Sequence, residues 1–137
     1  MPLHPQTSQS KPNLPAEFQP DHLGWQVSYD KYFSPSLVAT FNSTHYNFTT
    51  FKLFYTAVEA LVGVQYSDFA INVTNIVAVP DPGSIGGRVY VLGVESGHRR
   101  LGGELVSATD GAFAVIGVEG GERKIVEMRE SNNFPTG

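Results

Sequence analysis

The chain has 137 residues, an apolar fraction of 41%, a net charge of -4 and no cysteine. This length fits one domain with its own core. The acidic balance argues against nucleic-acid binding, which needs a basic surface. The absence of cysteine excludes disulfides, thiol nucleophiles and thiolate metal sites.

The two ends of the chain differ in composition from the middle. Prolines with polar spacers predict a flexible Pro-rich tail over residues 1–20. The folded domain is expected over 21–132, and polar residues predict a flexible end over 133–137. No apolar run reaches membrane-spanning length. Residues 1–7 lack the pattern of a secretory signal, so we expect a cytoplasmic protein. Three sequons, at Asn42, Asn47 and Asn72, leave secretion as a minor alternative.

Two helices are predicted in the first half of the domain. The first spans 22–33, and Ser34-Pro35 is expected to end it because a residue before proline avoids helical backbone. Residues 36–46 fit either a short strand or a helical turn. The second helix spans about 48–62, with Asn47 or Thr49 as its cap and Gly63 as its stop. Each helix has an apolar stripe at helical spacing: Trp25, Tyr29, Tyr32 and Phe33 on the first; Phe48, Phe51, Tyr55, Val58 and Val62 on the second.

The second half of the chain reads as strands. From Asp68 apolar residues alternate up to Val79, which predicts one buried face. Residues 88–96 are almost wholly apolar and predict a central strand covered on both faces. Residues 104–118 form a third strand, in which Asp110-Gly111 is either a tight turn or a bulge. Gly120-Gly121 turns the chain into a last strand over 124–130.

This order of elements resembles the nuclear transport factor 2-like superfamily, and within it the SnoaL-like polyketide cyclases and their fungal isomerase and cyclase relatives. The segments that carry the resemblance are 32–38 (Tyr-Phe-Ser-Pro-Ser-Leu-Val), the aromatic helix, and 124–127 (Lys-Ile-Val-Glu). The resemblance covers roughly 22–132. It implies an α+β fold, in which a cone-shaped, curved, mixed or antiparallel sheet wraps around N-terminal helices and encloses an apolar pocket. It also implies homodimers, formed through the outer face of the sheet, and catalysis without metal or organic cofactor.

The chain departs from these cyclases where their chemistry sits. They often carry His after Ile-Val-Glu and Asp two residues later, whereas this chain has Met128 and Glu130. Glu130 is therefore the first candidate for a general acid or base. By alternation it shares a face with Val126 and Met128, which suggests an apolar environment. The alternative is a solvated carboxylate at the end of the strand.

Aromatic residues supply the remaining candidates. Tyr29 and Tyr55 lie in apolar helical stripes, where a phenol can polarise a carbonyl or position a substrate. Ordinary core tyrosines are the alternative. The residues expected to shape the substrate pocket are Trp25, Phe51, Tyr90 and Met128.

Other polar residues are assigned to the surface. Glu95 and Glu104 flank a turn that contains His98, and this grouping favours a solvated turn over a proton shuttle. His45 lies in a polar loop. The histidines show no metal-binding spacing, so we expect no metal.

Together these features predict a cofactor-independent isomerase, cyclase or dehydratase that acts on a hydrophobic polyketide- or terpenoid-like small molecule. The alternative is a non-catalytic module of the same fold that binds small molecules or dimerises.

Overall fold

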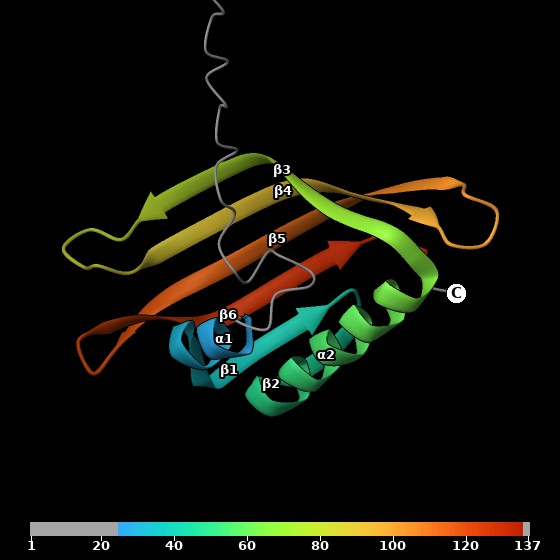
Figure 1. The fold of residues 1–137 in the computed structure, drawn as a ribbon. Coiled ribbons are helices and arrows are strands. Elements are labelled where there is room, and N and C mark those ends of the chain that lie inside the picture. Colours follow the sequence, from blue (N-terminus) through green and yellow to red (C-terminus); the bar gives the residue numbers. More distant parts are fainter. Residues whose placement is uncertain (1–24, 136–137) are drawn as a thin grey trace, which may run out of the picture.

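A computed structural model describes residues 25–135 and has two helices on one face of a six-stranded sheet (Figure 1). The Pro-rich tail lies outside the described residues. The elements in chain order are α1 (Trp25–Tyr32), β1 (Phe33–Phe41), β2 (Thr44–Asn47), α2 (Phe48–Gln65), β3 (Tyr66–Pro80), β4 (Gly87–Arg99), β5 (Leu105–Glu119) and β6 (Glu122–Asn132).

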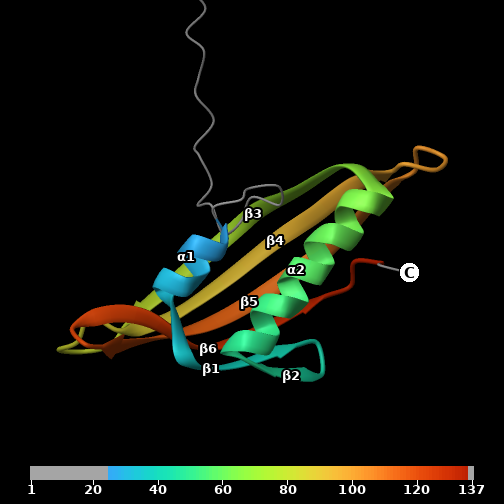
Figure 2. The same ribbon diagram turned by 60° about the horizontal axis from the view of Figure 1, so that its bottom comes forward.

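The sheet is mixed and open, with the strand order β2-β1-β6-β5-β4-β3. Only β1 and β6 pair in parallel, and the other neighbours are antiparallel. Both helices lie against the same face of the curved sheet (Figure 2). The predicted α+β class, with a mixed sheet around N-terminal helices, is therefore confirmed.

The first helix ends one residue earlier than predicted, and the predicted start over 22–24 lies outside the described residues. It ends at Tyr32, and Phe33 begins β1, so Ser34-Pro35 lies inside a strand. The β1–β6 register is irregular between Phe33 and Val38, which accommodates a proline without an N–H to donate. The segment left open in the sequence, 36–46, forms most of β1 and β2, with a turn at Asn42 (φ 51) between them.

The second helix begins as predicted and ends later. The Asn47 side chain accepts a hydrogen bond from the Thr50 N–H at 2.9 Å, and the Thr50 hydroxyl accepts one from the Asn47 N–H at 3.0 Å. This capping box confirms Asn47 as the cap. The stop at Gly63 is wrong, because the helix continues to Gln65. A glycine inside a helix costs only about 1 kcal/mol, which packing of the neighbouring Val62 offsets.

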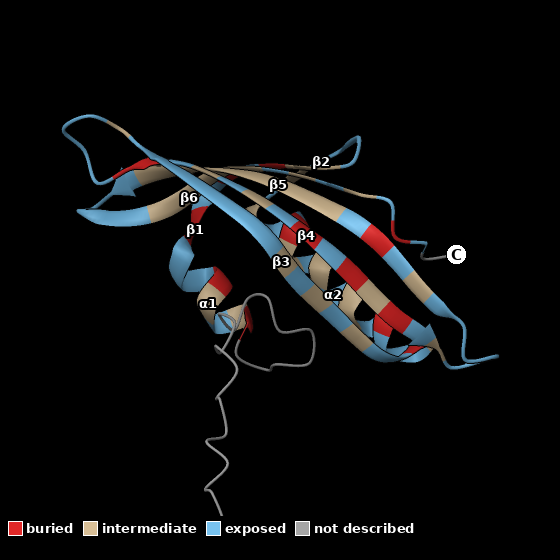
Figure 3. Cartoon of the chain, turned by 90° about the horizontal axis from the view of Figure 1, so that it is seen from above, coloured by how far each residue is buried: buried red, intermediate tan, exposed pale blue. Residues whose placement is uncertain are grey.

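The helices cover only one face of the sheet, and this overturns one strand prediction. Along β4, Tyr90 and Leu92 are 46% and 52% exposed, while Gly93 and Glu95 are buried (Figure 3). The strand is central but is not covered on both faces. We call the face away from the helices the outer face.

Two strands also differ from their predictions: β3 has an irregularity that was not predicted, and β5 lacks one that was. In β3 the register shifts between Val73 and Asn75, so Ile71 and Val73 face the helices whereas Val77 and Val79 lie on the outer face. In β5 both neighbouring ladders run unbroken past Asp110-Gly111, which is therefore neither a turn nor a bulge. The Gly120-Gly121 turn is confirmed, and both residues have positive φ (58 and 80).

Of the end predicted to be flexible, residues 133–135 are described and pack against β3, while 136–137 lie outside the described residues. Phe134 is 7% exposed, and its ring lies 5.0 Å from that of Tyr66 and 5.4 Å from that of Phe69. The Tyr66 hydroxyl donates to the Pro135 carbonyl at 2.8 Å. An aromatic residue can hold a polar chain end in place because its burial outweighs the entropy lost.

Neither described helix combines the length and the apolar character needed to cross a membrane.

Candidate active site

A cavity of about 610 Å³ lies between the helices and the sheet. Its wall is mostly hydrocarbon, with side chains from both helices and from β1, β3, β4, β5 and β6. The volume lies in the range of small-molecule sites. The expected apolar pocket is thus present in the structure.

Three carboxyl groups meet on the sheet side of this cavity. Glu95 comes from β4, Asp110 from β5 and Glu130 from β6, and one oxygen of each lies within 4.8 Å of the others. The strand register brings them together: Asp110 pairs with Gly93 on one side and with Asn132 on the other. Glu95 and Glu130 each stand two residues from these partners, so the three side chains form a diagonal across adjacent strands. We call them the carboxyl cluster.

Glu130 faces the cavity and is surrounded by protein atoms. The Tyr55 hydroxyl donates a short hydrogen bond to its Oε2. Burial, followed by the charge and hydrogen bond of Asp110, raises the pKa of Glu130 well above its usual value, and the Tyr55 hydrogen bond opposes this only in part. Glu130 is thus a carboxyl that holds its proton at higher pH than an ordinary glutamate.

Glu95 is only 6% exposed. Burial and the neighbouring Asp110 raise its pKa to about 8, although the Asn132 amide donates to its Oε2 at 3.3 Å. Asp110 Oδ2 is buried and receives no hydrogen bond from the described residues. Like charges this close cannot all ionise, so the carboxyl cluster shares protons at neutral pH.

Of the two tyrosines, the structure brings only Tyr55 to the carboxyl cluster. Burial, then the Glu130 charge, raises the pKa of Tyr55 well above its usual value, so its proton stays available. Tyr29 also lines the cavity, but its hydroxyl donates to the Phe48 carbonyl at 2.8 Å and its ring stacks on Phe33 at 4.3 Å. The Tyr29 proton is thus already engaged by the backbone.

Two of the four expected pocket residues line the cavity. Trp25 and Met128 are part of its wall. Phe51 is fully buried in the core, where its ring lies 4.7 Å from that of Tyr55, so it supports the wall from behind. Tyr90 lies on the outer face against Phe113, at 5.1 Å between rings, and its assignment to the pocket is wrong.

Comparison with solved structures identifies the fold. Residues covering 89% of this chain superpose on 82% of a nuclear transport factor 2-like superfamily protein from Salmonella enterica, with a TM-score of 0.60 and 15% identity. A candidate SnoaL-like polyketide cyclase from Jannaschia sp. CCS1 matches over 85% of this chain and 78% of its own, with a TM-score of 0.59 and 18% identity. The chain has the NTF2-like fold.

The NTF2-like fold is not confined to enzymes. The association domain of the Caenorhabditis elegans kinase CaMKII matches over 77% of this chain and 79% of its own, with a TM-score of 0.60 and 14% identity. No family model and no curated protein matches this sequence. At such identities the comparisons show the fold, and the site must support any function.

Two residues of the carboxyl cluster, Glu95 and Asp110, were not predicted from the sequence as site residues. Glu95 was assigned to a solvated turn, but β4 continues to Arg99 and the turn begins later. Asp110 was assigned to a tight turn or a bulge, because Asp-Gly is a common turn pair. Alternation gave one usable signal: Glu95 has the parity of Val89 and Val91, which face the cavity.

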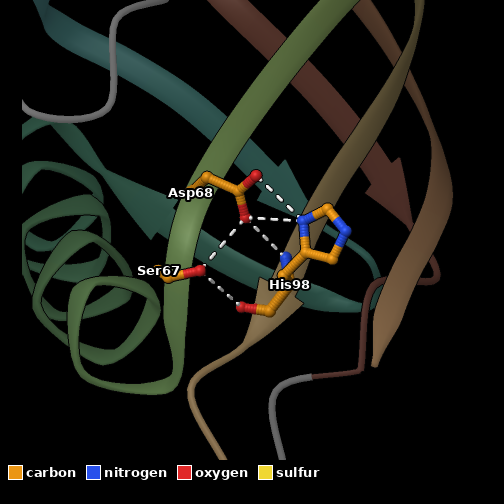
Figure 4. A network of polar contacts seen from close by, with 3 residues as sticks. All are labelled: Ser67, Asp68 and His98. Atoms are coloured by element: carbon orange, nitrogen blue, oxygen red, sulfur yellow. Dashed lines mark hydrogen bonds and ion pairs between the residues drawn. The ribbon is translucent and has the colours of Figure 1, made fainter. Parts of the chain in front are cut away.

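The remaining histidine candidates lie away from the cavity. His98 Nδ1 lies 2.9 Å from Asp68 Oδ2, and the Ser67 hydroxyl contacts Asp68 and the His98 carbonyl (Figure 4). Because Ser67 does not contact the imidazole, this group joins β3 to β4 at the surface and is no nucleophilic triad. His45 is exposed and lies 3.2 Å from the Thr40 hydroxyl.

The carboxyl cluster offers oxygen ligands of the kind that hard cations prefer. Such ions take six or more ligands, and most of the surrounding wall is hydrocarbon. The donor set therefore suits proton exchange better than the binding of a hard metal ion, and the prediction of a metal-free site stays a prediction.

Proposed function

We propose that this protein is a cofactor-independent isomerase, cyclase or dehydratase for a hydrophobic polyketide- or terpenoid-like molecule. The observation that carries the proposal is the Glu130 carboxyl, which faces an apolar cavity and is linked to Tyr55, Asp110 and Glu95. A carboxyl whose pKa is raised towards neutrality is suited to general acid–base catalysis, because it can give up and regain a proton near the working pH.

In this proposal Glu130 moves a proton at a carbon next to a substrate carbonyl. In its ionised form it removes the proton, and in its protonated form it returns the proton to another atom of the same substrate. The Tyr55 hydroxyl donates to Glu130 while that carboxyl is ionised. Once Glu130 has taken up the substrate proton, the Tyr55 hydroxyl turns to the carbonyl oxygen and donates to it as negative charge develops there. Asp110 and Glu95 exchange protons with Glu130 and so keep both of its forms accessible.

The substrate class follows from the wall and from the fold. A cavity of about 610 Å³ lined by aromatic and aliphatic side chains and by four carboxyl groups favours a rigid multi-ring skeleton over an anionic or extended metabolite. The candidate SnoaL-like polyketide cyclase with the same fold supports chemistry on such skeletons.

Hydrogen–deuterium exchange tests the proposal without knowledge of the substrate. The protein is incubated in D₂O with a panel of polycyclic ketones, and deuterium next to the carbonyl is followed by mass spectrometry. We expect protein-dependent exchange that falls by about a hundredfold or more in Glu130→Gln. The exposed Glu122→Gln variant serves as the matched control and keeps the wild-type rate. Exchange that survives in Glu130→Gln would remove Glu130 from the reaction.

A non-catalytic binding or dimerisation module is the second candidate. It is favoured by Met128, which occupies the place of the cyclase histidine and lines the cavity, and by the CaMKII association domain, which has the same fold. Tight binding of the panel ketones without any exchange would favour this function.

We further propose a homodimer formed through the outer face. Val77, Tyr90, Leu92 and Val94 are 50%, 46%, 52% and 37% exposed and lie on neighbouring strands there. A contiguous apolar patch of this kind is typical of an interface. Sedimentation velocity measures the mass directly. The cytoplasmic location expected from the sequence is likewise a proposal. Detection of a glycan at any of the three sequons would contradict it.

A further inference from the structure

The charges that line the cavity all have the same sign. Glu59, Glu95, Asp110 and Glu130 contribute carboxyl groups, and no Lys, Arg or His from residues 25–135 lines it. A wall of hydrocarbon side chains alone would keep water out of the cavity. Carboxyl groups in the wall lose hydration, which costs free energy. Their presence indicates a ligand that repays part of this cost.

One acceptor in the carboxyl cluster has no N–H or hydroxyl donor among the described residues. Asp110 Oδ2 is buried and receives no hydrogen bond from the described residues. Buried acceptors are normally satisfied, and a protonated Glu95 or Glu130 can donate to Asp110. When both glutamates are ionised, the donor to Asp110 has to come from inside the cavity. The Glu95 and Glu130 oxygens nearby add two further acceptors for the same donor.

Much of the remaining wall is aromatic. Trp25, Tyr29, Phe33, Phe54 and Tyr55 line the cavity. The indole of Trp25 donates to Glu59 Oε2 at 2.8 Å, which places a further carboxylate beside these rings. Aromatic faces attract cations, and more so in a water-poor site.

We propose that the cavity binds a lipophilic molecule that carries a protonated amine or another cationic centre, with the positive charge held at the carboxyl cluster and the skeleton against the aromatic wall. This rests on the proposed function, because it uses the same cavity and names the class of its ligand. An ammonium group supplies the missing donor to Asp110 and favours the ionised carboxyls.

The proposal implies that binding depends on pH. The titratable groups that face the carboxyl cluster and its cavity are Tyr29 and Tyr32 from α1, and Tyr55 and Glu59 from α2. None of them is cationic, so nothing on the described walls competes with a bound ammonium. As the pH rises and the carboxyl cluster loses protons, a cation binds more tightly. A neutral ligand of the same shape gains nothing.

Three fluorescent probes with one skeleton test this: anthracenylmethylamine, anthracenylmethanol and anthracene carboxylate. Their dissociation constants are measured with the wild-type protein at about pH 6 and about pH 8. We expect the amine to bind at least about tenfold more tightly than the alcohol at the higher pH, and less selectively at the lower pH. The carboxylate is expected to bind more weakly than either.

Variants assign the effect to the carboxyl cluster. Glu95→Gln and Asp110→Asn should each weaken amine binding by about tenfold and leave alcohol binding unchanged. Glu122→Gln should change neither. An alcohol that binds as tightly as the amine at both pH values would overturn the inference, as would failure of all three probes to bind. The wild-type comparison stands even where a variant does not fold.

The outcomes separate this inference from the proposed function. Preference for the amine without any ketone exchange would refute the proposed enzyme and keep the inference. Ketone exchange that depends on Glu130, without preference for the amine, would refute the inference and keep the enzyme.

Discussion

Replacing Glu95 by Gln should flatten the dependence of protein stability on pH. In the folded protein the pKa of Glu95 is raised from 4.5 to about 8, first by burial and then by Asp110. An acid whose pKa is raised on folding contributes stability that is fully present below the unfolded value and is lost as pH rises through the folded value. The stability window is therefore between about pH 4.5 and about pH 8.

The magnitude follows from the same values. Within this window each such carboxyl lowers the free energy of unfolding by about 1.4 kcal/mol per pH unit. Glu95 alone then costs the folded protein on the order of 5 kcal/mol between the two ends of the window. Glutamine has the same shape and does not ionise, so the Glu95→Gln variant should lose this part of the slope. A smaller slope should remain, because the pKa of Glu130 is raised as well.

Urea denaturation at closely spaced pH values measures this slope. Wild type should lose stability from acid to mildly alkaline pH, and Glu95→Gln should become the more stable of the two at the alkaline end. Glu122→Gln, at the exposed first position of β6, should follow wild type. A wild-type stability that is flat across the window, or a Glu95→Gln slope equal to that of wild type, would refute the account of a shared, protonated carboxyl cluster.

Three further predictions concern single side chains. Tyr55→Phe removes a donor to Glu130, so it should raise the pKa of Glu130 further and slow ketone exchange by roughly ten- to thousandfold; an unchanged rate would leave Tyr55 as a core residue. Phe134→Ala should lower the free energy of unfolding by about 3 kcal/mol, because the ring is buried against Tyr66 and Phe69; a loss below about 0.5 kcal/mol would mean that the chain end contributes nothing. Leu92→Arg places a charge on the outer face and should yield a monomer in sedimentation velocity with normal probe binding; an unchanged mass would exclude this face as the interface.

Much of the fold could be predicted because its signals are local. The helical stripe through Phe51 and Tyr55, the cap at Asn47 and the turn at Gly120-Gly121 all appear where periodicity and turn chemistry predict them. The face of β4 that carries Tyr90 could not be predicted, since an almost wholly apolar strand does not show whether helices cover one side or both.

The site was predicted only in part, because some of its signals are local and others depend on how strands pair. Glu130 and Tyr55 were identified because each carries a polar group within an apolar pattern, and the structure joins them. Asp110 and Glu95 become neighbours of Glu130 only through the register of three strands, and register is not readable from one sequence. Residue types that are common in active sites can also lie outside the site. The Ser67 hydroxyl and the His98 imidazole are exposed, and their contacts only join β3 to β4.

The most direct test of the central claim is carbon NMR of the protein with isotope-labelled glutamate side-chain carboxyls, recorded as a function of pH. The account predicts two carboxyls that titrate far above the usual glutamate range, with one signal lost in Glu95→Gln and the other in Glu130→Gln. If every glutamate of the wild-type protein titrates near its ordinary pKa, neither Glu95 nor Glu130 is protonated at neutral pH. That result would contradict the proposed acid–base chemistry.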